Sequence, residues 1–198
     1  MTGAPTLRTS RLLLRPWQAA DRAPFAALNR DPGVVEFLGE PLTREQSDAL
    51  ADRIEADFEG RAFGLWAVEI PEVTPFAGFV GLSVPRFDAP FMPAVEVGWR
   101  LASGYWGRGY ATEGAVASLA FGFEVVGLDE VISLTVEDNT RSRRVMERAG
   151  MTHDSADDFD HPLVSPGDRL RHHVLYRARR SGWSPPGSCG RTASGAEV

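Results

Sequence analysis

A glycine-rich turn near the middle of the chain, SGYWGRGYA at residues 103–111, separates two segments of different hydrophobic period. Before the turn, residues 94–101 (AVEVGWRL) alternate with a period of two, which places Val95 and Val97 on one face of a strand and Glu96 on the other. After the turn, residues 112–126 carry apolar side chains at helical spacing. The order strand, glycine turn, helix predicts a sheet on which helices pack.

The rest of the chain extends this pattern in both directions. We expect strands at residues 7–17, 63–69, 76–84, 130–136 and 170–177, and helices at residues 21–29, 43–58 and 139–149. Asn139 is placed to cap the last helix and Gly150 to end it. The predicted fold class is α/β, of the α+β kind, with a mixed and mostly antiparallel sheet that carries helices on both faces.

Length and composition indicate one compact domain. The chain has 198 residues, 43% of them hydrophobic, so a single core can form without disulfides or metals. We place this domain at residues 1–180 and expect residues 181–198, which are rich in Gly, Ser and Pro, to be a disordered tail. The sole cysteine, Cys189, lies in that tail, so direct group transfer is expected rather than an acyl intermediate on a core thiol.

Charge and hydropathy disfavour several classes of partner. The formal net charge of −6 argues against nucleic acid, because that binding needs basic residues against phosphates. No apolar run approaches the roughly 18 residues of a membrane span, and the N-terminal sequence lacks the features of a signal peptide. We therefore predict a cytoplasmic protein without membrane contact, suited to an amine substrate. The oligomeric state is left open, a homodimer included.

The glycine turn is suited to binding phosphate. Gly104, Gly107 and Gly109 allow backbone N–H groups to turn inward, and the N-terminus of the following helix adds partial positive charge. A Walker A motif would need Lys and then Ser or Thr where Ala115 and Val116 stand. The glycine spacing also differs from that of a dinucleotide fingerprint. With both motifs rejected, the remaining interpretation is a pyrophosphate-binding loop of another kind.

The turn resembles the cofactor loop of the GNAT acetyltransferase superfamily, which follows Q/R-x-x-G-x-G/A and here reads WGRGYA at residues 106–111. Trp106 replaces the Gln or Arg, and the longer run GYWGRGYATE is similar to the RimJ/RimL branch of ribosomal-protein N-terminal acetyltransferases. A second segment, NTRSRRVMERAG at residues 139–150, resembles the N-x-x-S-x-x-v-x-E-x-x-G segment of that branch. The motifs occur in the expected order, and the similarity extends over residues 7–177.

The resemblance implies that acetyl-CoA binds in a V-shaped opening between the strands at residues 94–101 and 130–136. Backbone groups of the first strand, the glycine turn with the start of its helix, and one capping side chain would hold it. The implied cofactor-binding residues are Trp99, Arg100, Leu101, Trp106, Gly107, Arg108, Gly109, Tyr110, Ala111, Thr112 and Asn139. For Asn139, a role as helix cap alone is the alternative.

Two residues are candidates for catalysis. Glu96 would act as general base, through water, on the face opposite Val95 and Val97; the alternative is a strand carboxylate that pairs with an arginine. Many superfamily members protonate the leaving thiolate with a tyrosine, but Met146 stands at that position, and Ser142 is the substitute that the branch suggests. Ser142 would hydrogen-bond the thiolate; the alternative is a first-turn helix serine without a catalytic role.

Two charged segments remain. Arg141, Arg143, Arg144 and Arg148 form a basic helix that either reaches cofactor phosphates or forms a solvated face. All four histidines lie in residues 153–173 beside several aspartates, but their spacing matches no known ligand pattern, so no metal is predicted. We interpret this segment as a loop whose carboxylates attract a cationic amine.

The predicted function is N-acetyl transfer from acetyl-CoA to a primary amine, either a protein N-terminus or a small amine, by direct transfer in a ternary complex. The alternative is a noncatalytic CoA-binding domain with a regulatory or interaction role. The residues do not identify the acceptor.

Overall fold

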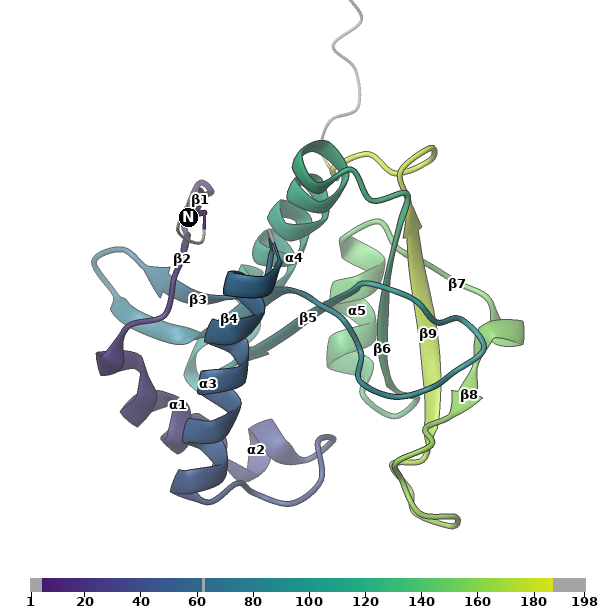
Figure 1. Ribbon diagram of the computed structural model, residues 1–198, viewed down its shortest axis with the longest axis horizontal. Helices are drawn as coiled ribbons and strands as arrows, with labels where there is room; N and C mark the ends of the chain where they lie inside the picture. The colour runs from purple at the N-terminus through teal and green to yellow at the C-terminus, as the bar shows by residue number, and fades with distance from the viewer. Residues whose placement is uncertain (1–4, 62, 187–198) are drawn as a thin grey trace, which may run out of the picture.

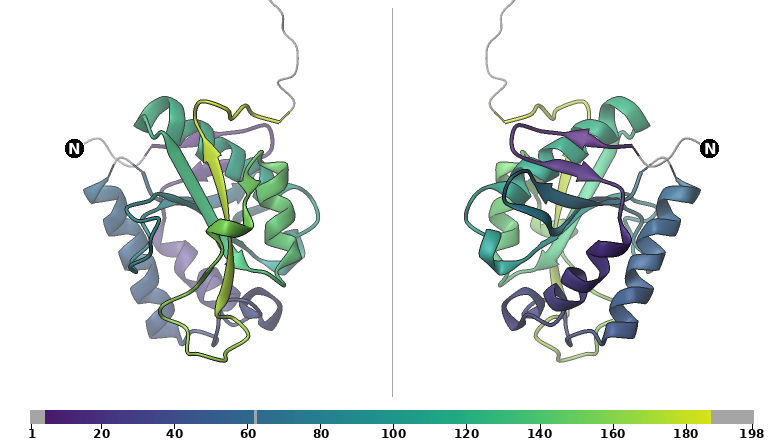
Figure 2. Two further views of the ribbon diagram at one scale, coloured as in Figure 1. Left: turned by 90° about the vertical axis from the view of Figure 1, so that its right-hand side faces the viewer. Right: turned by 90° about the vertical axis from the view of Figure 1, so that its left-hand side faces the viewer.

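The protein folds around one highly curved mixed sheet, seen in a computed structural model that describes residues 5–61 and 63–186 (Figures 1 and 2). Within those ranges the strand order is β1-β2-β3-β4-β5-β6-β9-β7, and β8 also pairs with β9. The strands are β1 (Leu7–Arg8), β2 (Leu13–Arg15), β3 (Leu65–Ile70), β4 (Thr74–Ser83), β5 (Glu96–Leu101), β6 (Glu130–Val136), β7 (Thr152–His153), β8 (Phe159–Asp160) and β9 (His172–Arg179). All pairs are antiparallel except β5 with β6.

Helices cover both faces of the sheet (Figure 2). On one face lie α1 (Arg22–Leu28) and α3 (Arg44–Gly60), whose Phe25 and Ile54 pack with Phe79 of β4. On the other lie α4 (Tyr110–Phe121) and α5 (Thr140–Arg148), which pack on Trp66 and the neighbouring apolar residues. The short α2 (Pro32–Val35) follows α1. The predicted fold class is therefore confirmed.

The strand period assigns side chains to these two cores. Along β3, Trp66 and Val68 belong to the core under α4, whereas Ala67 between them belongs to the core under α1 and α3. Along β4, Phe79 and Val80 divide in the same way. Since both faces are covered, these strands are buried on both sides and read as nearly continuous apolar runs.

Most predicted elements occur within a few residues of their expected ends, and the exceptions have local causes. Residues 7–17 form two short strands rather than one, because the chain reverses where the Thr9 N–H donates to the Leu12 carbonyl (3.0 Å). The helix predicted from Thr112 begins at Tyr110, with Gly109 as its N-cap. Its predicted last turn is instead a wider π turn over Gly122–Val126.

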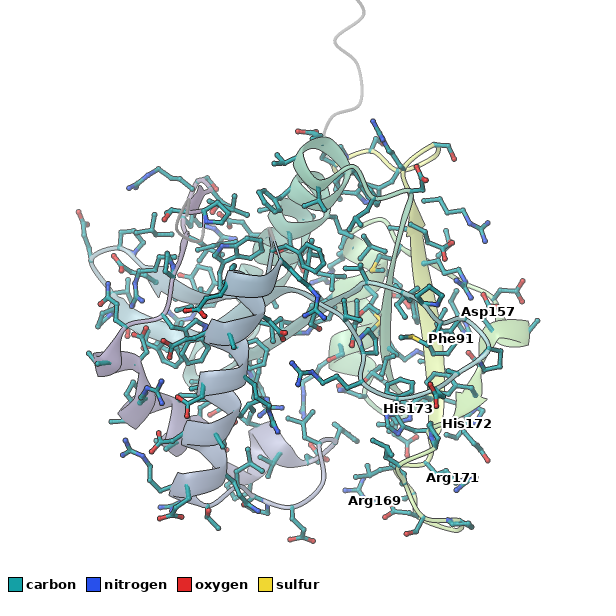
Figure 3. All side chains as sticks on the ribbon, in the orientation of Figure 1. Phe91, Asp157, Arg169, Arg171, His172 and His173 are labelled. Atoms are coloured by element: carbon teal, nitrogen blue, oxygen red, sulfur yellow. The ribbon has the colours of Figure 1, made fainter. Side chains whose placement is uncertain are left out.

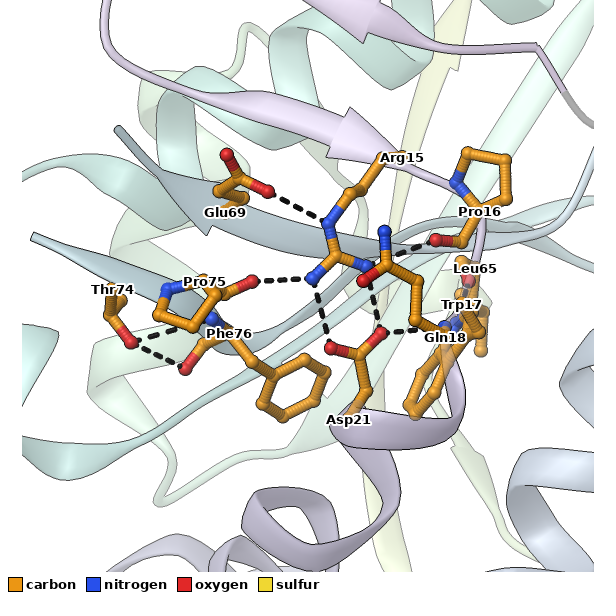
Figure 4. Close-up of polar contacts among 10 residues, drawn as sticks. All are labelled: Arg15, Pro16, Trp17, Gln18, Asp21, Leu65, Glu69, Thr74, Pro75 and Phe76. Carbon is orange, nitrogen blue, oxygen red and sulfur yellow. Dashed lines mark hydrogen bonds and ion pairs between the residues drawn. The ribbon is translucent and has the colours of Figure 1, made fainter. Parts of the chain in front are cut away.

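A fully satisfied buried arginine fixes the entry of the chain into the sheet (Figure 4). The two terminal nitrogens of Arg15 donate to Asp21 Oδ2 (2.8 Å) and Oδ1 (2.9 Å), and Nε donates to Glu69 Oε2 (2.9 Å). The remaining donors reach the carbonyl oxygens of Pro16 and Pro75. Together these contacts raise the pKa of Arg15, first through the hydrogen bond to Asp21 and against the effect of burial. All five N–H groups of this guanidinium thus have acceptors.

The prediction that residues 181–198 form a disordered tail is wrong for the first of these residues. Trp183 packs against the core, where its indole N–H donates to the Ala149 carbonyl (2.8 Å) and its ring lies 5.2 Å from that of Phe123. A composition averaged over the segment could not show this, because a single large aromatic side chain supplies most of the contact area. Residues 187–198 lie outside the described residues. No helix in the described part of the chain is both long and apolar enough to cross a membrane.

We predict that Trp183→Ala destabilises the protein by about 2–3 kcal/mol, because it leaves a cavity beside Phe123 and an unpaired Ala149 carbonyl. Urea denaturation followed by circular dichroism measures the free energy of unfolding. Trp183→Phe is the matched control and should retain part of the packing. An unchanged free energy of unfolding in Trp183→Ala would mean that the residues after 180 do not belong to the folded domain.

Candidate functional site

The site lies where β5 separates from β6. The only register pair recorded between these parallel strands joins Glu96 to Ile132, and the Ile132 N–H donates to the Val95 carbonyl (2.8 Å). Beyond this bridge β5 stays paired with β4 as far as Leu101, and β6 stays paired with β9 as far as Val136. The inner edges of both strands therefore diverge, which gives the predicted V-shaped opening.

Backbone polar groups of β5 line this opening. Because the Val95 carbonyl points toward β6, alternation directs the backbone groups of Val97, Trp99 and Leu101 to the same edge. The Leu101 carbonyl accepts a hydrogen bond from the Trp106 indole (2.7 Å), which folds the glycine turn back onto the end of the strand. An extended ligand could pair with this edge as an added strand.

A cavity of about 450 Å³ occupies the opening, bounded by α2, the end of β5, the glycine turn, the start of α4 and one face of α5. It brings together Ser142 and all but one of the residues predicted to bind the cofactor. These are Trp99, Arg100, Leu101, Trp106, Gly107, Gly109, Tyr110, Ala111, Thr112 and Asn139. The segments come from three parts of the sequence and meet only in the fold.

Two predicted residues lie elsewhere. Arg108 is exposed and is not among the residues that line the cavity, although its carbonyl accepts a hydrogen bond from Arg11 (2.9 Å). Glu96 lies at the bridge with Ile132, where the two strands begin to separate. In the described part of the chain Glu96 has no arginine within ion-pair distance, and burial raises the pKa of its carboxyl group to about 7.

The glycine turn ends in an anion-binding helix terminus. Gly107 and Gly109 have positive φ angles of 72° and 81°, a conformation in which a residue with a Cβ is strained. The Glu113 N–H is the first that donates within the helix, to the Gly109 carbonyl (3.0 Å). The N–H groups of Tyr110 to Thr112 precede that bond, and all three residues line the cavity, so they and the helix dipole favour an anion there.

One face of α5 adds positive charge to the same cavity. Arg141, Arg144 and Arg148 line it at helical spacing, whereas Arg143 points away to the Tyr176 hydroxyl (3.4 Å) and the Glu137 carbonyl. The basic run is therefore divided, and three of its four members face the cavity. The spacing of three and four residues between these arginines could have indicated from the sequence that they share one face of the helix.

Asn139 and Ser142 form a small network at the start of α5. The Asn139 Oδ1 accepts from the Ser142 N–H (3.2 Å), which confirms Asn139 as the helix N-cap. Its Nδ2 donates to Thr135 Oγ1 (3.0 Å) and to Ser142 Oγ (3.1 Å). Since Ser142 Oγ accepts from Asn139, its own hydroxyl proton is available to a group in the cavity.

The sequence did not indicate the wall formed by α2. Gly33, Val34, Phe37 and Leu38 line the cavity opposite α5. Arg141 joins the two walls, because it pairs with Glu36 (2.7 Å) and lies over the Trp106 ring at 4.7 Å. The pair with Glu36 spans more than a hundred residues of sequence, and no local pattern marks it.

Three carboxylates of the aspartate and histidine segment are paired with basic side chains, so the predicted acidic loop is largely neutralised, whereas Asp154 has no recorded ion pair in the described part of the chain and accepts from the Ala156 N–H (3.0 Å). Asp157 pairs with Arg177 (2.7 Å), Asp158 with His153 (2.8 Å) and Asp160 with Arg171 (2.9 Å). Figure 3 shows Asp157, Arg171, His172 and His173 together on the β8–β9 side of the molecule. No group of three or more metal-ligating side chains occurs among the residues that the structure describes.

Glu113, in the first turns of α4, ties the N-terminal segment to the glycine turn. Its Oε1 accepts from Thr9 Oγ1 (2.6 Å) and from the Arg11 N–H (2.8 Å), and its Oε2 pairs with the Arg11 guanidinium (2.6 Å). The same guanidinium donates to the Arg108 carbonyl and lies 4.9 Å from the centre of the Tyr110 ring. Burial opposes ionisation, but the hydrogen bonds from Thr9 and Arg11 hold the pKa of Glu113 below its usual range.

Comparison with known proteins identifies the family. Residues 11–152 match the family model of the acetyltransferase (GNAT) domain. The FsC-acetyl coenzyme A-N(2)-transacetylase of Aspergillus fumigatus is 34% identical over 155 residues, which are 75% of this chain and 66%, just under two thirds, of that protein. An acetyltransferase structure from Agrobacterium tumefaciens is 30% identical, with a TM-score of 0.71 over 90% of this chain and 96% of its own.

A more distant structure shares the fold. The RimL ribosomal α-N-protein acetyltransferase in complex with coenzyme A is 16% identical, with a TM-score of 0.70 over 88% of this chain and 98% of its own. The family model covers well over half of the sequence. The chain therefore belongs to the GNAT acetyltransferase family.

We predict that Glu113→Gln destabilises the protein by about 2 kcal/mol at neutral pH, because it removes the charge that Arg11 and Thr9 bind. The pKa of Glu113 is lowered in the folded state, so its ionised form contributes stability above the unfolded-state pKa of about 4.3. That contribution is lost as the pH falls through the folded-state pKa. Urea denaturation from pH 3 to pH 7 should therefore show a gap between wild type and variant that closes toward low pH.

Glu124→Gln, at an exposed glutamate in the turn after α4, removes the same charge and should change the free energy of unfolding little. A gap between wild type and Glu113→Gln that stayed constant across the pH range would contradict a stabilising role for the ionised Glu113 carboxylate.

Proposed function

We propose that this member of the GNAT family binds acetyl-CoA in the opening between β5 and β6 and transfers its acetyl group directly to a primary amine. The observation that carries the proposal is the junction of two features in one cavity: an unpaired strand edge and an anion-binding helix terminus. A strand edge suits the amide groups of pantetheine, and a helix terminus suits a diphosphate. With the donor bound in this way, its thioester would lie near the bridge at Glu96.

The charges around the cavity support this orientation of acetyl-CoA. The free N–H groups at the start of α4 and the residues Arg144 and Arg148 line the cavity, so the phosphates of the donor belong beside them. Trp99 offers a backbone donor and acceptor along β5 toward the bridge, and Leu101 offers its N–H, since its carbonyl already accepts from Trp106. Asn139, in addition to capping α5, keeps a carbonyl lone pair with which it could meet an amide of the donor.

Glu96 and Ser142 then have different roles in the transfer. With a pKa of about 7, Glu96 can accept a proton, through water, from an α-amine whose reference pKa is about 8. The amine nitrogen attacks the thioester carbonyl carbon, a C–N bond forms, and the C–S bond breaks. Ser142, whose hydroxyl proton is free of Asn139, hydrogen-bonds the departing thiolate. Because no side chain carries the acetyl group, transfer takes place in a ternary complex.

The proposal also covers the branch of the family, the kind of acceptor and the location in the cell. Trp106 in the cofactor loop, together with Ser142 in place of a tyrosine acid, supports the RimJ/RimL branch. The name of the Aspergillus relative describes acetyl transfer to nitrogen, which supports an amine acceptor. A cytoplasmic location would give access to the acetyl-CoA pool.

Donor binding should depend on Gly109. We predict that Gly109→Trp abolishes acetyl-CoA binding, measured by isothermal titration calorimetry, because the new side chain would start 3.4 Å from the Arg11 guanidinium that holds the glycine turn, and its backbone would be strained at a φ of 81°. Gly104→Trp is the matched control, since Gly104 does not line the cavity and an added Cβ there meets open space. Unchanged affinity in Gly109→Trp would place the donor elsewhere.

Turnover should depend on Glu96. Release of free thiol from acetyl-CoA is measured with a panel of small amines and peptide N-termini. We predict that wild-type kcat/KM rises with pH through about 7, as the carboxyl group with its raised pKa becomes ionised. Glu96→Gln should lower kcat by about a hundredfold, remove that rise and leave acetyl-CoA affinity intact. Full turnover in this variant would remove Glu96 as the base.

Acetyl-CoA binding without thiol release by any acceptor would instead favour the alternative, a noncatalytic CoA-binding domain.

A further inference from the structure

Arg100 is a half-buried cation with very little of its hydrogen-bonding capacity used. Its Nη1 donates to Asn29 Oδ1 (2.5 Å), and its guanidinium lies 5.5 Å from the centre of the Phe79 ring. Within the described ranges no carboxylate lies within ion-pair distance of it, and Asn29 is its one recorded hydrogen-bond partner. Arg15 offers the contrast, because all five of its N–H groups have acceptors, two carboxylates among them.

The unused donors of Arg100 remain accessible beside the cavity between β5 and β6. Arg100 lines that cavity, and none of its nitrogens is both buried and without a hydrogen-bond partner. A guanidinium removed from bulk water without a counter-ion is costly, and burial lowers its pKa to about 10. A planar group with paired N–H donors matches a carboxylate, which accepts two parallel hydrogen bonds.

The position of Arg100 points to the acceptor rather than the donor. Its side chain leaves β5 on the face of α1 and Phe79, whereas the proposed diphosphate site at α4 lies on the opposite face of the sheet. On its own face the strand period aligns Arg100 with Glu96, the proposed base. The residue between them is Gly98, where an added Cβ would have only Glu96 Oε1 nearby, at 4.0 Å. Gly98 therefore puts no side chain between the base and the cation.

We infer that the acceptor is an amine that also carries a carboxylate, and that Arg100 binds this carboxylate while the amine lies over Gly98 near Glu96. The inference rests on the proposed acetyl transfer and adds the chemical class of its acceptor. Such a carboxylate can belong to a free amino acid, or to an acidic side chain at the N-terminus of a peptide. In both cases it lies a few bonds from the amine.

The test compares matched acceptors with the complete chain and acetyl-CoA. Each amino acid is assayed beside its carboxamide, and short peptide amides beginning with Asp or Glu are assayed beside those beginning with Asn or Gln. Rates are referred to the deprotonated amine, because amidation changes the pKa of the α-amine. We expect kcat/KM to be higher for the carboxylate member by about tenfold or more, the effect of a charged hydrogen bond. The arm that shows the preference identifies the source of the carboxylate.

Variants then assign the preference to Arg100. Arg100→Gln should raise KM for carboxylate acceptors far more than for their carboxamides, and Arg100→Lys should retain part of the preference because it keeps the charge. The acetyl-CoA affinity of both variants should equal that of wild type. Arg53→Gln, at an exposed arginine on α3, is the charge-matched control and should keep the full preference.

Equal rates for carboxylates and carboxamides in wild type would overturn the inference without any variant, so a folding defect in Arg100→Gln cannot hide the result. A large loss of acetyl-CoA affinity in Arg100→Gln would also overturn it, because Arg100 would then bind the donor. Turnover of amines without a carboxylate preference would leave the proposed function standing. Absence of thiol release with every amine would instead refute the proposed function itself.

Discussion

The site depends on one bridge between two parallel strands. Glu96 of β5 pairs with Ile132 of β6, and beyond that point each strand is held only on its outer side, β5 by β4 and β6 by β9. Buried backbone N–H and C=O groups are nearly always paired in proteins, so two adjacent strand edges that separate inside a domain leave hydrogen bonds for something else to make. Here the sheet itself is incomplete, and the missing partner is proposed to be the donor.

The surrounding charges keep this opening in one shape. Glu113 and Arg11 fix the N-terminal segment against the glycine turn, and the Glu36–Arg141 pair joins α2 to α5 across the cavity. The first pair is partly shielded from water and has several further hydrogen bonds, so it should contribute more than the second, whose side chains are about half exposed. The turn is thus anchored by a partly buried pair, whereas the wall formed by α2 combines its surface pair with the hydrogen bonds from Ser103 to Asp31 (2.7 Å) and from Arg169 to the Glu36 carbonyl (2.7 Å).

The sequence predicted what is contiguous and missed what the fold brings together from a distance. The strand at 130–136, the Asn139 cap and the glycine turn each carry their signal within a few residues, and each occurs where expected. Nothing near Phe37 shows that α2 will face α5, because the contact depends on Arg141, more than a hundred residues away. Trp183 was missed because its glycine- and serine-rich neighbours outweighed it in composition. The aspartates near His153 were identified, but their arginine and histidine partners were not.

The geometry of a single strand explains how donor and acceptor can meet without competing for the same groups. A strand has edges, which carry backbone N–H and C=O groups, and faces, which carry side chains, and the two are roughly perpendicular. The free edge of β5 offers Trp99 and Leu101 backbone groups to an extended donor, while Glu96, Gly98 and Arg100 share one face. Replacing Arg100 by another residue would therefore change what lies on that face and leave the edge intact.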